Sequence, residues 1–138
     1  MNWLGLSIVT LLLWGTYPLF ANRSNAIHGE AVTMAVEALA MLVIALMGLA
    51  STRFDVSRVT TKSLTFSSVM AIGSSFGFYL FLKAIRMTPT RVGTIALITG
   101  LYPVITIVVA HFAGDQHMTP RHWLGAATAV VGLVLVSW

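Results

Sequence analysis

The sequence has no cysteine and very few charged residues. The absence of cysteine among the 138 residues excludes disulfides, thiolate catalysis and cysteine metal ligands. Only 9% of the residues are charged, against about 25% in an ordinary soluble domain. A small soluble protein must cover its surface with polar side chains, so this shortage excludes a soluble fold. With 57% apolar residues, the chain needs an apolar solvent, which is the lipid bilayer.

Clustered charge and catalytic motifs are also missing. The net charge is +4, but the basic residues stand singly between apolar blocks, which is typical of membrane-flanking anchors and unlike a nucleic-acid-binding stripe. The four His and four acidic residues are dispersed, without metal-ligand spacing, a phosphate loop or a Ser-His-acid arrangement. We therefore expect no enzyme, no cofactor, no metal site and no nucleic-acid partner. The first residues lack the basic start of a cleaved signal peptide, so we expect them to be retained.

Five apolar segments are present, each near the ~20 residues that cross ~30 Å of hydrocarbon. They cover about residues 3–21, 31–50, 64–82, 92–112 and 123–138. Their apolar residues are continuous rather than alternating, which predicts helices. The connections are short, so the sequence predicts one all-α, multi-pass integral membrane domain over residues 1–138, with about five transmembrane helices.

Glu37 is the most unusual residue in these segments. It lies about six residues into the second segment, roughly 9 Å deep at ~1.5 Å per residue. A charge inside hydrocarbon costs ~2.5–3.5 kcal/mol, so it usually has a function or a partner. Met34 and Met41 share its helix face, and this setting suits a cation, an amphipathic amine or an exchangeable proton. The alternative is a structural carboxyl group hydrogen-bonded to a neighbouring helix.

Aromatic and hydroxyl side chains in the other segments are candidates for lining a cavity with Glu37. The aromatic candidates are Trp14, Tyr17, Tyr79 and Tyr102. Hydroxyls such as Thr16, Thr99 and Thr106 have an equally good alternative, which is bonding back to a carbonyl of their own helix.

Prolines and small residues predict where helices bend and where they pack closely. Pro18 and Pro103 lie inside segments, and Gly100 precedes Pro103, so these three are hinge candidates, with a static kink as the alternative. Small residues four apart favour close helix contact: Gly73 and Gly77, Ala96 and Gly100, Gly125 and Ala129, with Gly132 following Thr128.

The order of several short motifs resembles the EamA-type domain of the drug/metabolite transporter superfamily. Trp14-Gly15-Thr16 resembles its start, and the similarity is strongest from about Ser74 onward. The motifs there are Ala84-Ile85, Thr88-Pro89, Arg91-Val92-Gly93, Leu101-Tyr102-Pro103-Val104, Gly114-Asp115, Trp123-Leu124-Gly125-Ala126 and Val131-Gly132. Asp115 departs from the family, which usually has Glu at this position, and we expect at most the same loop role from the shorter carboxylate.

The resemblance implies one repeat of a ten-helix inverted-repeat transporter fold. It favours a secondary exporter of small metabolites or drugs in the bacterial inner membrane, surrounded by lipid. A non-transporting scaffold subunit and a lipid-carrier flippase subunit are the alternatives. Since the sequence resembles one such repeat alone, we expect an antiparallel homodimer, with a paralogue as the rival partner. Lys and Arg are balanced, four on each side of five helices, which favours dual topology.

Overall fold

The computed structural model describes residues 2–57, 59–114 and 117–137, and these are helical with short connections. Four helical stretches are long and apolar enough to cross a membrane: Trp3–His28, Glu30–Ser51, Thr61–Met87 and Pro89–Phe112. A shorter apolar helix covers Pro120–Val136. The predicted all-helical membrane protein is confirmed. Arg58, Asp115 and Trp138, which entered the predictions, lie outside the described residues.

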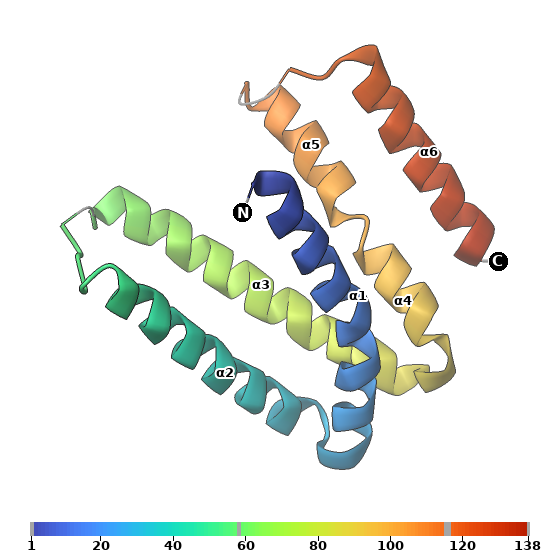
Figure 1. Cartoon of the computed structure of the whole chain (residues 1–138). Helices are drawn as coiled ribbons and strands as arrows, with labels where there is room; N and C mark the ends of the chain where they lie inside the picture. Colours follow the sequence, from blue (N-terminus) through green and yellow to red (C-terminus); the bar gives the residue numbers. More distant parts are fainter. Residues whose placement is uncertain (1, 58, 115–116, 138) are drawn as a thin grey trace. The chain divides into compact units, whose positions relative to one another are not determined.

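The helices form two units (Figure 1). The first unit, Met1–Pro89, contains α1 (Trp3–His28), α2 (Glu30–Ser51) and α3 (Thr61–Met87). The second unit, Thr90–Trp138, contains α4 (Val92–Thr99), α5 (Tyr102–Phe112) and α6 (Pro120–Ser137). A short 3-10 turn, Pro89–Arg91, precedes α4.

Local hydrogen bonds explain where the first helices begin and end. The Asn2 side chain accepts from the Gly5 amide at the start of α1, and Thr60 and Ser63 form a capping box at the start of α3. Gly29 ends α1 and begins α2 with φ 79°, a conformation that favours glycine. Because a single residue joins the two helices, α2 runs in roughly the opposite direction to α1 and contacts it.

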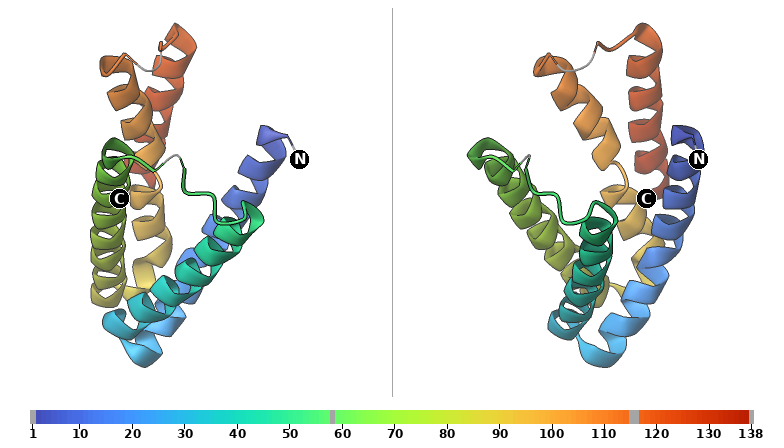
Figure 2. Two further views of the ribbon diagram at one scale, coloured as in Figure 1. Left: turned by 90° about the vertical axis from the view of Figure 1, so that its left-hand side faces the viewer. Right: turned by 60° about the vertical axis from the view of Figure 1, so that its left-hand side comes forward.

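In the first unit, the three helices meet at one end. Its buried residues are Pro18, Ala21, Asn25, Thr33, Leu82 and Ile85, all near the Gly29 turn. Figure 2 shows α2 and α3 close together at this end and apart at the end joined by residues 52–60. The large apolar side chains at the parted end are exposed, as expected for helices surrounded by lipid.

The helices extend beyond the predicted apolar segments. α1 continues to His28, although residues 22–30 were predicted to be a connection, and α3 runs from Thr61 to Met87. The difference arises because apolar composition marks the depth of the hydrocarbon, whereas a helix continues until its hydrogen bonding is interrupted.

In the second unit, the predicted continuous helix over residues 92–112 is broken. α4 ends at Thr99 and α5 begins at Tyr102, with Gly100 and Leu101 in a turn. Pro103 lacks an N–H and its ring clashes with the carbonyl four residues earlier, which accounts for the break. Within this unit, α4 contacts α6, and the rings of His111 in α5 and Trp123 in α6 meet edge to face with their centroids 5.8 Å apart.

Candidate functional site

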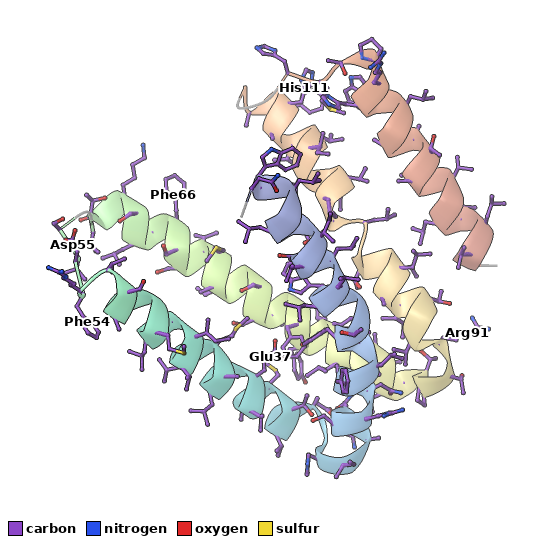
Figure 3. All side chains as sticks on the ribbon, viewed as in Figure 1. Glu37, Phe54, Asp55, Phe66, Arg91 and His111 are labelled. Carbon is purple, nitrogen blue, oxygen red and sulfur yellow. The ribbon has the colours of Figure 1, made fainter. Side chains whose placement is uncertain are left out.

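Glu37 and Tyr17 form the centre of the candidate site. The Tyr17 hydroxyl donates a hydrogen bond of 3.0 Å to Oε2 of Glu37, which joins α1 to α2. Figure 3 shows the Glu37 side chain directed from α2 towards the other two helices of the first unit. Both residues are partly buried. The bond gives a partner to a carboxyl group that would otherwise face hydrocarbon alone.

Two phenylalanines of α3 complete an aromatic wall beside this pair. The Tyr17 ring lies 5.8 Å from the Phe78 ring and 6.3 Å from the Phe81 ring, measured between centroids. Phe78 and Phe81 stand 6.4 Å apart, one helical turn from each other. A carboxylate next to aromatic faces attracts an ammonium group, both by charge and by cation–π interaction.

An apolar groove passes the same region between α2 and α3. Its volume is about 510 Å³, and its lining comprises Met34, Ala71, Ile72, Ser75, Phe76 and Tyr79. Met34 precedes Glu37 by one turn of α2, so the groove runs close to the carboxyl group. The candidate site therefore combines a polar centre with space for an apolar chain.

A second hollow lies at the Gly29 turn, and we call it the turn hollow. Its volume is about 500 Å³, and it is lined by residues 22 and 25–28, by Gly29, and by Arg86 and Pro89. Arg86 of α3 forms an ion pair with Glu30 of α2. Nearby, the Ser24 and Thr33 hydroxyls are 3.0 Å apart and the Thr33 hydroxyl also donates to the Gly29 carbonyl.

Sequence reasoning missed the residues of the turn hollow. Asn25 and Arg86 were assigned to connections, where polar residues are ordinary. The opposite charges of Glu30 and Arg86 could have suggested an ion pair. They lie in the first and third connections, which an up-and-down arrangement of helices places on the same face of the membrane. Nothing in the sequence pairs them directly, since 56 residues separate them.

The other cavity candidates lie in different settings. Tyr79 lines the groove, whereas Trp14 and Tyr102 are 59% and 50% exposed. Tyr102 belongs to the second unit and Trp14 to the first. The hydroxyls of Thr16, Thr99 and Thr106 donate to carbonyls of the preceding helical turn, as in the alternative given for them.

The hinge candidates occupy different settings. Pro18 is buried inside α1, which continues through it. Gly100 and Pro103 lie at the junction of α4 and α5. A Cβ placed on Gly100 would lie 2.9 Å from the Ala96 carbonyl oxygen, so a larger residue at this position would require the turn to shift.

The small residues mark open positions on the helices. A Cβ added to Gly73, Gly77, Gly125 or Gly132 would meet no atom within 4 Å among the described residues. Ala96 and Ala129 are partly exposed. Within its own unit, therefore, none of these described glycines makes a close helix contact.

Comparison with known proteins yields one family and a group of distant relatives. The model of the family described as "EamA-like transporter family" matches residues 1–138. Two relatives are each named "Probable 4-amino-4-deoxy-L-arabinose-phosphoundecaprenol flippase subunit ArnE", one from Yersinia pseudotuberculosis serotype O:1b (strain IP 31758) and one from Yersinia pestis (strain Pestoides F). Each is 26% identical over 82 residues, which cover 59% of this chain and 70% of the relative. No solved structure matches the chain.

Proposed function

The chain belongs to the EamA-like transporter family, as its motifs predicted, and on that premise we propose that it is a transporter subunit for amphipathic amines. The observation that carries the proposal is the hydrogen bond between Tyr17 and Glu37, set beside two aromatic rings and an apolar groove. This arrangement offers an anionic group to an amine and apolar surface to the remainder of the same molecule.

The proposed cycle is an exchange at one carboxyl group. An incoming ammonium takes the place of the Tyr17 hydroxyl and of any proton on Glu37, and the aromatic rings of α3 cover its other side. The apolar part of the substrate lies in the groove between α2 and α3. Release on the opposite side follows when a proton returns to Glu37, which couples export to proton entry.

A lipid-linked amine is the second candidate substrate, and the groove favours it. The groove is lined mainly by apolar side chains, which suit a hydrocarbon chain, and the headgroup is proposed to meet Glu37. The named substrate of the Yersinia relatives carries an amine on its sugar and a polyprenol chain, which is the same combination of features. This candidate makes the chain a flippase subunit of the bacterial inner membrane.

The subunit is proposed to act as an antiparallel homodimer. Five segments supply one repeat, and two inverted repeats with the site at their interface are a common transporter arrangement. The open glycine positions Gly73 and Gly77 of α3, with Gly125 and Gly132 of α6, leave room for a second chain to approach closely. A paralogous chain inserted in the opposite orientation is the rival partner.

Replacement of the Glu37 carboxyl by an amide tests the proposal. Proteoliposomes containing Glu37→Gln should lose at least about tenfold of proton-driven uptake of radiolabelled phenethylamine, because the amide keeps the shape but no longer attracts an ammonium ion. The matched control is Asp55→Asn, an identical chemical change in the connection between α2 and α3. Uptake by Glu37→Gln equal to that of the wild type would assign Glu37 a structural role, and absence of uptake by the wild type would favour a scaffold.

The same proteoliposomes distinguish the two substrate classes. Phenethylamine has no long chain, whereas a long-chain alkylamine with a fluorescent tail group reports movement between leaflets. Glu37-dependent movement of the long-chain probe alone would favour the flippase function. Transport of both probes would favour an exporter with broad selectivity.

A further inference from the structure

A histidine side chain closes the start of α6 in the second unit. α6 begins at Pro120, and the carbonyl of the preceding Thr119 accepts hydrogen bonds from the amides of His122 and Trp123, at 2.9 and 3.2 Å. In the reverse direction, the Thr119 amide donates to Nδ1 of His122 at 3.2 Å. In a capping box this second bond is made by a Glu or Gln side chain at the third helical position. In α6 a histidine occupies that position, so the bond depends on protonation.

The direction of this bond fixes the hydrogen on the His122 ring. A backbone N–H can only donate, so Nδ1 accepts, carries no hydrogen itself, and leaves the ring hydrogen on Nε2. A second proton on the ring would turn Nδ1 into a donor that faces the N–H of Thr119, and the bond would be lost. The bond is therefore present at high pH and lost as the pH falls.

A second imidazole holds the neighbouring amide. The Met118 amide donates to Nδ1 of His111 at 3.4 Å, and the His111 ring packs against the rings of Phe112 and Trp123. Figure 3 shows His111 where α5 ends. A cation is favoured in the last turn of a helix and disfavoured in the first turn. Protonation is thus opposed more strongly at His122, in the first turn of α6, than at His111, in the last turn of α5.

Few ionisable residues in the second unit can compensate a charge on His122. In the sequence of this unit they are Arg91, Tyr102, His111, Asp115, His117 and Arg121. Those in or beside the connection to α6 are basic, apart from Asp115, which lies outside the described residues. α4, which contacts α6, has no ionisable side chain. Among the described residues of this unit, therefore, no carboxylate is present to hold a protonated His122 ring in place.

We propose that His122 is a proton-binding group that controls the start of α6. Histidine is the side chain that ordinarily changes charge between about pH 5 and pH 8. At the upper end of this range the Thr119 amide is held by the ring, and at the lower end it is released and the first turn of α6 loosens. The proposal concerns the second unit and does not depend on the proposed role of Glu37 in the first.

Hydrogen exchange of the Thr119 amide tests the proposal. The full chain and His122→Asn are compared by NMR in phosphatidylcholine nanodiscs at the same pH, because the ratio of their rates cancels the intrinsic pH dependence of exchange. Asparagine places an acceptor oxygen where Nδ1 stands and does not bind a proton in this range. We expect equal rates at about pH 8 and at least about tenfold faster exchange in the wild type at about pH 5.

The same change at His28, in the first unit, is the matched control. His28→Asn should keep the pH dependence of the wild type, and loss of that dependence would assign it to another histidine and overturn the proposal. Equal rates for the wild type and His122→Asn at both pH values would also overturn it. If His122→Asn fails to fold, ¹⁵N spectra of the wild-type rings decide the matter. A His122 ring that carries its hydrogen on Nδ1 at about pH 8 contradicts the proposal.

Discussion

Polar residues of the first unit connect its helices through a small number of bonds. Tyr17 bonds to Glu37 across α1 and α2, Asn25 bonds to the Leu82 carbonyl across α1 and α3, and Arg86 pairs with Glu30 across α3 and α2. Each pair of the three helices is therefore linked once by the side chains named here. Lipid supplies little hydrophobic drive between helices, so such polar links carry much of the specificity of their arrangement.

Gly29 is the residue on which the turn hollow depends. Its φ of 79° and ψ of 169° lie in a region that is essentially open only to glycine, and a side chain there is strained by about 1–3 kcal/mol. We expect Gly29→Ala to lower the thermal stability of the purified protein. Circular dichroism during heating in detergent measures this effect.

Gly48→Ala is the control for this substitution. Gly48 lies within α2, and a Cβ added there meets no atom within 4 Å among the described residues. Alanine favours a helix over glycine by up to ~1 kcal/mol, so this variant should be unchanged or slightly more stable. A loss of stability in Gly48→Ala equal to that of Gly29→Ala would show that backbone strain at the turn is not the cause.

The candidate site was only partly predictable from its residues. Glu37 stands out because a carboxyl group within an apolar run is costly, and Tyr17 stands out as an amphipathic ring in the first segment. Their contact could not be predicted. The two residues are twenty positions apart in the sequence, and the sequence does not fix how α1 and α2 are rotated about their own axes. Asn25 gave no indication at all, because it falls in a polar stretch that was predicted to be a connection.

At the scale of the helices, composition and hydrogen bonding set different boundaries. The apolar segments predict the number and order of the elements, because hydrocarbon thickness requires runs of a given length. The helix ends follow caps and turns instead, as at Asn2, Thr60 and Gly29. The break between α4 and α5 illustrates a third cause, the missing N–H of Pro103. Proline positions were visible in the sequence, but whether each helix kinks or breaks depends on neighbouring residues, as the continuous α1 at Pro18 shows.

Replacing Pro103 should extend one of these helices. In Pro103→Ala the new amide can donate to the Thr99 carbonyl, so we expect the break to close and α4 to continue into α5. Hydrogen exchange of the amides of residues 100–104 in nanodiscs measures this, and we expect at least about tenfold slower exchange. Pro18→Ala should change exchange less, because α1 is already continuous there. Unchanged exchange at residues 100–104 would mean that the break between α4 and α5 is caused by Gly100 and its hydrogen bond to the Ala96 carbonyl, and not by Pro103.

At the scale of the whole molecule, the charges give no preferred orientation. Arg53, Arg58, Lys62 and Arg121 flank the segments on one side, and Arg23, Lys83, Arg86 and Arg91 flank them on the other. The cytoplasmic side normally carries the excess of Lys and Arg, so four against four leaves the orientation undecided. This balance is what an antiparallel homodimer requires, because one sequence must then insert both ways.

The orientation can be measured with a pair of reporters on the C-terminus. Fusions to a reporter active only in the cytoplasm and to one active only outside it should both give activity. Two added lysines on one side, Ser51→Lys with Thr52→Lys, should bias the population towards one orientation and reduce transport by removing antiparallel partners. Activity from only one wild-type fusion would contradict dual topology and favour a paralogous partner of opposite orientation.

The divergence of α2 and α3 has a mechanical consequence for the membrane. The first unit is narrow at the Gly29 turn and wide at the end joined by residues 52–60 (Figure 2). Taken by itself, this unit displaces more lipid at the end joined by residues 52–60 than at the Gly29 turn. Copies of the unit inserted in opposite directions would balance that displacement between the two leaflets.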